Sequence, residues 1–99
     1  MIIVTGAVLT TPETYAEMVG MSIEHSARSR AEPGCSAHNV HVDCENPNRL
    51  VFVEHWADMD ALKAHFAVPE SRAFAGALTT LAAEAPEMNI FAAEDVTPA

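Results

Sequence analysis

Glu32-Pro-Gly-Cys-Ser-Ala-His-Asn-Val-His-Val-Asp43, followed after a turn by Pro47-Asn-Arg-Leu-Val-Phe-Val-Glu-His-Trp56, is the stretch that decides the fold. Each half alternates as a β-strand does, and the polar residues 45–48 between them are typical of a turn. Residues 35–56 are therefore predicted to form a β-hairpin. The hairpin leads directly into a predicted helix over 58–67, for which Asp58 is the expected N-cap.

The flanking segments complete a regular order of elements. Apolar and β-branched residues predict a strand over 2–10, and Thr11-Pro12-Glu13 indicates the start of a helix that Pro33-Gly34 ends. The helix after the hairpin is broken at Pro69, and residues 88–93 predict a last strand. This is the order of a ferredoxin-like βαββαβ fold, an α+β fold with an antiparallel four-stranded sheet and helices on one face. The first helix is predicted to bury Tyr15, Met18, Val19, Ser22, Ile23, Ser26 and Ala27.

The strand over 49–56 carries apolar side chains on both faces. Leu50, Phe52 and Trp56 share one face, and Val51 and Val53 lie on the other. The helices of the domain cover only one face, so a second chain is expected to cover the other. We therefore expect a homodimer.

Composition indicates one globular domain, residues 1–99, of which 49% are apolar. Fourteen acidic and five basic side chains give a net charge of −9, which disfavours nucleic acid and anionic membranes as partners. No apolar run is long enough to span a bilayer, and residues 1–4 are predicted to begin a strand rather than a signal peptide. We therefore expect a cytoplasmic protein. Cys35 and Cys44 are expected to be reduced thiols, because a strand separates them by roughly 30 Å, too far for a disulfide.

Beyond these general features, the chain resembles the antibiotic biosynthesis monooxygenase family over nearly its whole length. The resemblance rests on Glu32-Pro-Gly-Cys35, Asp43, Pro47-Asn-Arg49, Glu54-His-Trp56, Asp60-Ala-Leu-Lys-Ala-His65 and Ser71-Arg-Ala-Phe74. It implies that two copies pair into a dimeric α+β barrel. Family members include cofactor-free oxygenases of polyketide aromatics and quinols, haem-degrading enzymes, and isomerases of small signalling sugars.

The chain departs from two branches of the family, and these departures narrow the activities that the resemblance implies. The haem-degrading branch uses an Asn on the first strand, a Trp on the second helical region and a downstream His. Here Gly6 and His65 occupy the first two places, and no histidine follows Phe74. The polyketide-oxidising branch pairs an Asn with a Trp four residues later, whereas here Phe52 takes the Asn position and Trp56 remains. No haem or other cofactor is therefore expected.

Three residues are the leading candidates for catalysis. His65 is predicted on the apolar side of its helix, where it either accepts a proton near pH 7 or is a buried, hydrogen-bonded helix residue. His38 is predicted to face the same space, or else to be satisfied at the strand edge. Trp56 either packs in the core or offers a flat wall and an indole N–H to an aromatic substrate.

Four further residues are candidates for binding the substrate: Phe52, Glu54, Phe66 and Arg72. Glu54 is either buried with a perturbed pKa or an ordinary charge at the rim of a dimer. Arg72 either lies on a solvated helix face or holds an acidic group of the substrate.

The spacing of the histidines predicts no metal site. His38 and His41 point to opposite faces of one strand, and His25 lies in the middle of a helix. The chain also lacks the His-x-x-x-His pair that marks many helical metal sites.

Pattern and resemblance together favour a cofactor-independent monooxygenase that oxidises a small aromatic phenol or quinol with dioxygen. Such a reaction requires an apolar pocket, a proton acceptor and hydrogen bonds to the developing oxyanion. Two alternatives stay open. One is an isomerase of a small hydroxyketone, in which the same histidines move protons, and the other is a non-catalytic module for ligand binding and dimerisation.

Overall fold

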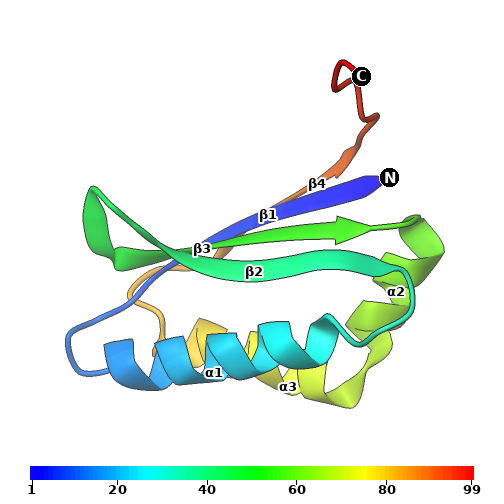
Figure 1. Cartoon of the computed structure of the whole chain (residues 1–99). Helices are drawn as coiled ribbons and strands as arrows, with labels where there is room; N and C mark the ends of the chain where they lie inside the picture. Colours follow the sequence, from blue (N-terminus) through cyan, green and yellow to red (C-terminus); the bar gives the residue numbers. More distant parts are fainter.

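The computed structural model describes residues 1–99 as a sheet with helices on one side (Figure 1). The elements are β1 (Ile2–Leu9), α1 (Tyr15–Ser29), β2 (Cys35–Asp43), β3 (Asn46–Trp56), α2 (Met59–Ala67), α3 (Pro69–Leu81) and β4 (Glu87–Ala92). The sheet is antiparallel with the order β2-β3-β1-β4. The predicted ferredoxin-like βαββαβ fold is thus confirmed, with its second helix divided at Val68. None of the helices combines the length and apolarity that crossing a membrane requires.

The β2–β3 hairpin has the faces that the alternation predicts. His38 lies opposite Glu54, and Val40 lies opposite Phe52. His38 and Glu54 are both buried beneath the helices. At the other side of β3, strand β1 runs antiparallel and places Ile2 opposite Trp56. The inner face of β3 therefore determines what lies between the sheet and the helices.

Two apolar clusters pack in this layer, and β3 contributes to both. The first consists of Val8, Met18, Leu50, Phe52 and Leu78. The second consists of Ile2, Val4, Trp56 and Leu62. Between them, β3 presents the carboxyl side chain of Glu54, which is 7% exposed. The core is thus interrupted by a polar region at the middle of the sheet.

Helix α1 differs from its prediction in its start and in its buried face. It begins at Tyr15 because Thr11 and Thr14 form a preceding turn, in which their hydroxyl oxygens lie 2.9 Å apart. The buried residues are Met18, Ser22, His25, Ser26 and Ser29. The prediction that Ile23 is buried is wrong, since its side chain is 56% exposed. The helix is rotated so that His25, rather than Ile23, faces the sheet.

The outer face of the sheet is left open by the chain's own elements. Val51 and Val53 on β3 are only partly buried, and Phe91 on β4 is 52% exposed. Phe91 lies opposite Ile3 of β1, so apolar side chains continue across neighbouring strands. This is the surface that the sequence predicts a second chain to cover.

Gly34 sets the distance between the start of β2 and helix α2. Its φ of +82° is a conformation that side chains other than glycine rarely adopt, and a Cβ there would lie 2.6 Å from Ala61 Cβ. The Gly34 carbonyl accepts a hydrogen bond from the Ala57 amide at 2.8 Å. The segment that leads into α2 is therefore tied to the beginning of the hairpin.

Replacement of Gly34 is the first test of this arrangement. Gly34→Ala introduces both the strained φ and the contact with Ala61, so it should destabilise the protein by more than about 1 kcal/mol. Gly20→Ala is the matched control, because no atom lies within 4 Å of a Cβ there and alanine favours a helix by about 0.5–1 kcal/mol. Urea unfolding measures both changes. Equal stability of the two variants would contradict this account of Gly34.

Candidate active site

A cavity of about 330 Å³ lies between the sheet and the helices. Half of the residues that line it are hydrophobic, among them Val4, Val8, Phe52, Phe74 and Leu78. Its polar lining includes His25, Glu54, His65, Ser71 and Arg72. The cavity thus has the composition of a site for a small, mainly apolar ligand with a few polar groups.

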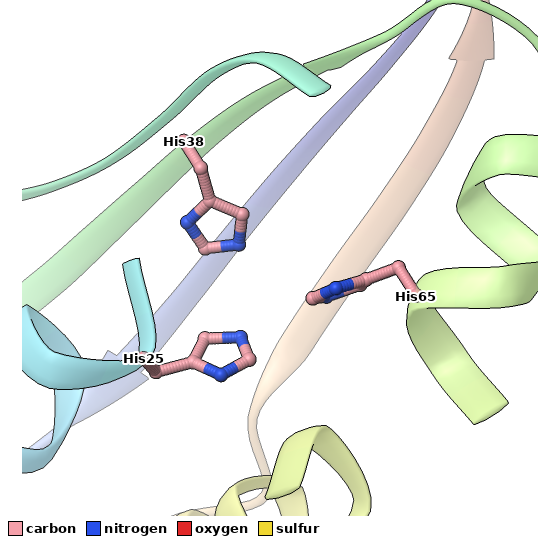
Figure 2. A group of neighbouring side chains, drawn as sticks. All are labelled: His25, His38 and His65. Carbon is pink, nitrogen blue, oxygen red and sulfur yellow. The ribbon is translucent and has the colours of Figure 1, made fainter. Parts of the chain in front are cut away.

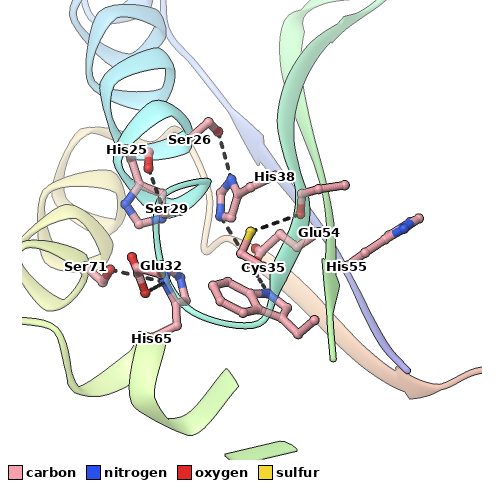
Figure 3. A network of polar contacts seen from close by, with 12 residues as sticks. His25, Ser26, Ser29, Glu32, Cys35, His38, Glu54, His55, His65 and Ser71 are labelled. Atoms are coloured by element: carbon pink, nitrogen blue, oxygen red, sulfur yellow. Dashed lines mark hydrogen bonds and ion pairs between the residues drawn. The ribbon is translucent and has the colours of Figure 1, made fainter. Parts of the chain in front are cut away.

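His65 enters the cavity from α2 and is held by an acidic partner. Its side chain is 3% exposed, and its Nδ1 lies 3.0 Å from Oε1 of Glu32 (Figure 3). A carboxylate only accepts, so Nδ1 carries the proton and Nε2 keeps a lone pair. Ser71 Oγ is a more distant neighbour of Nδ1, at 3.5 Å. Glu32 thereby fixes both the orientation of the ring and the nitrogen that can accept a proton.

Glu54 is a buried carboxyl group with two partners from the sheet. Trp56 Nε1 donates a hydrogen bond of 2.9 Å to Glu54 Oε1. His38 Nε2 lies 3.4 Å from the same oxygen, while Ser26 Oγ lies 2.9 Å from His38 Nδ1. Burial alone raises the pKa of Glu54, but its contacts with His38 and Trp56 outweigh burial and lower the pKa below its usual value. Glu54 is therefore a negative charge at the inner end of the cavity.

His25 is a buried histidine of α1 that the sequence did not single out. Its ring stacks on Phe74 of α3 with the ring centroids 4.0 Å apart. Its Nδ1 lies 3.2 Å from Nη2 of Arg28, which is a donor, so this nitrogen accepts. Burial, followed by the charges of His38, His65 and Arg28, lowers the pKa of His25 from 6.5 to about 3.

His25, His38 and His65 come together from three different elements. One ring nitrogen of each lies within 4.8 Å of one nitrogen of each of the others, and all three residues are buried. Figure 2 shows the three rings directed toward a common space. The spacing of histidines along single elements did not predict this cluster, because the fold assembles it from α1, β2 and α2. One signal in the sequence could have indicated the burial of His25. It lies on the same face of α1 as Met18 and Ser22, at a spacing of i, i+4 and i+7.

The structure brings most of the predicted site residues to the cavity. Phe52, Glu54, His65, Phe66 and Arg72 line it. His38 and Trp56 do not line it, and both are fully buried. Of the two roles considered for Trp56, the structure shows the packing of its indole in the core. Its observed contact is the hydrogen bond to Glu54. Both cysteines, Cys35 and Cys44, are free thiols, as expected.

Fold and site together define a ferredoxin-like α+β domain that encloses an apolar cavity beside buried histidine and glutamate side chains. The model of the family described as antibiotic biosynthesis monooxygenase matches residues 1–77. The chain belongs to this family. The resemblance drawn from its motifs is thereby confirmed.

Individual proteins similar to this chain include one sequence relative and solved structures of the same fold. The chain is 30% identical over 90 residues to an uncharacterized protein of Synechocystis, a match that covers 91% of this chain and 61% of that protein. The chain thus spans less than two thirds of that relative's length. The crystal structure of a candidate antibiotic biosynthesis monooxygenase from Deinococcus radiodurans is 23% identical to this chain, with a TM-score of 0.93 over 100% of this chain and 98% of that one. The crystal structure of another candidate monooxygenase of this family, from Caulobacter crescentus, is 25% identical, with a TM-score of 0.87 over 95% of this chain and 90% of that one.

The low pKa of His25 predicts a loss of stability in acid. The folded ring stays neutral to about pH 3, whereas an unfolded histidine binds a proton near pH 6.5. The unfolded state therefore binds more protons between these values, and the free energy of unfolding falls as the pH drops from 6.5 toward 3. His38, His65, Arg28 and Glu54 also face this ring.

Urea unfolding across this pH range tests the role of His25. His25→Gln removes the proton linkage, so its free energy of unfolding should change less with pH than that of the wild type. His41→Gln is the control, since His41 is exposed on β2. The same pH dependence in the wild type and His25→Gln would show that His25 does not cause the acid sensitivity.

Proposed function

We propose that this protein is a monooxygenase that oxidises a small phenol or quinol with dioxygen and uses no resident cofactor. The observation that carries the proposal is the Glu32–His65 pair at the edge of an apolar cavity. A histidine whose Nδ1 proton is held by a carboxylate presents a basic Nε2 and is stabilised once that nitrogen is protonated. Membership of the monooxygenase family supports the same chemistry.

The cavity suits an aromatic substrate of modest size. Phe52 and Phe74 lie with their ring centroids 6.0 Å apart in an edge-to-face arrangement, and both line the cavity. Their apolar surfaces favour a flat hydrocarbon ring over water. Arg72 is exposed at the cavity, where it can receive an acidic or carbonyl group of the substrate. The substrate hydroxyl is then directed toward His65.

The proposed reaction is a deprotonation followed by electron transfer to dioxygen. His65 Nε2 takes the proton of the substrate hydroxyl, and the resulting anion is electron-rich enough to reduce dioxygen. One oxygen atom forms a bond to a ring carbon and the other leaves as water. The substrate supplies all four electrons, so a quinol becomes a hydroxylated quinone and no external reductant is consumed. Exclusion of water from the apolar cavity keeps the anion unsolvated and therefore reactive.

Replacement of His65 tests the proposed base. With an oxidised substrate found in a screen of phenols and quinols, His65→Ala should lower turnover by about 10²–10⁴-fold. Glu32→Gln should lower turnover less, because it keeps an acceptor for Nδ1 but removes the charge that stabilises the imidazolium. An oxygen electrode measures the rate, and His41→Ala is the matched surface control.

Two results would contradict the proposed function. Full activity per folded molecule in His65→Ala, with only a loss of about 1–3 kcal/mol in stability, would make His65 a structural residue. Turnover of a hydroxyketone without uptake of dioxygen would identify an isomerase instead.

The proposal includes a homodimer formed through the outer face of the sheet. Sedimentation equilibrium at micromolar concentration should give about twice the chain mass of 10.6 kDa. Phe91→Lys places a charge on this face and should shift the protein toward the monomer. Ile23→Lys is the matched control, because Ile23 is equally exposed on α1, on the other side of the molecule. A wild-type protein that sediments only at 10.6 kDa would refute the dimer.

A further inference from the structure

We propose that His25, His38 and His65 form a binding site for one divalent transition-metal ion, and that Zn²⁺ is the ion whose coordination they suit best. The three side chains come from α1, β2 and α2, and all are buried. Neutral imidazole is a preferred ligand of Zn²⁺, Ni²⁺ and Cu²⁺. Three histidines with one open position are also a recurring arrangement of tetrahedral zinc.

The distances between the rings are close to those of such a site. Zn–N bonds of about 2.0–2.1 Å at tetrahedral angles place the ligand nitrogens about 3.3 Å apart. The three nitrogens here lie within 4.8 Å of one another, so each needs to move inward by less than about 1 Å. Ring centroid distances of 5.0, 5.3 and 5.6 Å show that the three histidines are nearly equidistant.

The partners of the other ring nitrogens favour metal binding at two of the three histidines. Nδ1 of His65 donates to Glu32, and Nδ1 of His38 lies 2.9 Å from the hydroxyl of Ser26. The Glu32 carboxylate leaves His65 Nε2 free to bind a metal and raises its basicity. The Ser26 hydroxyl does the same for His38 when it accepts the Nδ1 proton, and a metal ion on Nε2 selects that tautomer. His38 Nε2 is buried and has no hydrogen-bond partner, although the Glu54 carboxylate lies 3.4 Å away. A buried nitrogen without a partner, beside a negative charge, is suited to a cation.

Arg28 opposes binding at the third histidine. Its guanidinium lies 3.2 Å from Nδ1 of His25 and can only donate, so the proton of His25 is on Nε2. A metal ion at Nε2 requires this proton to move to Nδ1 and Arg28 to turn away. Arg28 therefore weakens Zn²⁺ binding without being a ligand. Replacement of Arg28 should consequently strengthen Zn²⁺ binding.

The cavity supplies the open coordination position. His25 and His65 line the cavity, whereas His38 is fully buried and does not, so an ion held by all three would border the cavity. Water or an anionic oxygen can occupy the fourth position. An ion on His65 Nε2 would also remove the proton acceptor of the proposed function. We therefore expect the metal-loaded protein to lose cofactor-free oxidation, and only this last consequence depends on the proposed function.

Titration with Zn²⁺ alone tests the site without any substrate. After dialysis against a chelator, calorimetry in a non-chelating buffer should show one Zn²⁺ per chain, and the melting temperature should rise with Zn²⁺ concentration. His25→Ala, His38→Ala and His65→Ala should each weaken binding by at least about 100-fold, and Glu32→Ala by about 10–100-fold. His41→Ala is the control that should keep the wild-type affinity. Circular dichroism confirms that each variant is folded.

Arg28→Gln tests the site without removing a histidine, so it remains informative if a histidine variant fails to fold. The glutamine carbonyl can accept the proton of His25 Nδ1, so this variant should bind Zn²⁺ about 10-fold more tightly than the wild type. Unchanged affinity in Arg28→Gln would remove His25 from the ligands and overturn the three-histidine site. Absence of stoichiometric binding would overturn it as well, and so would binding that survives all three histidine substitutions. Because no substrate is present, these results are independent of whether the chain oxidises quinols.

Discussion

Burial of the Glu54 carboxylate is the constraint on which the interior depends. A buried charge costs several kcal/mol unless it is paired and hydrogen-bonded, and Glu54 is 7% exposed. Trp56 supplies an N–H at 2.9 Å, and His38 supplies a ring nitrogen at 3.4 Å. His38 is in turn held by Ser26 of α1. Satisfying one carboxylate therefore ties together two neighbouring strands and the helix above them.

This polar chain explains why the core consists of two apolar clusters rather than one. Along the inner face of β3, Leu50 and Phe52 belong to the first cluster and Trp56 to the second, with Glu54 between them. The cavity opens beside this interruption, since both Phe52 and Glu54 line it. A continuous apolar core would leave the sheet and helices in full contact with no polar group inside. The residue that divides the core thus also places a charge beside the cavity.

The order of elements and the faces of the hairpin were predictable because both follow from local rules. Alternation along β2 and β3 correctly places His38 and Glu54 on one inner face. The cluster with His25 was not predictable in this way, because it depends on the rotation of α1 and on how closely α2 approaches. The face of α1 that carries His25 also carries serines, where apolar residues are usual. The hydrophobic pattern therefore predicted that Ile23, rather than His25, would be buried. Likewise, nothing in the pattern distinguished Trp56 in the core from Trp56 at a cavity.

The chemistry of the cavity depends less on the number of histidines than on which nitrogen of each is basic. Glu32 holds the proton of His65 on Nδ1 and so presents Nε2 as an acceptor, whether its partner is a substrate hydroxyl or a metal ion. Arg28 does the opposite at His25 and leaves a donor on the cavity side. With His25 as a donor and His65 as an acceptor, the site can stabilise an oxyanion and take up a proton at the same time. Glu32 thus supports either role of His65, whereas Arg28 favours proton transfer over metal binding, and removal of the charge at position 28 should shift that balance.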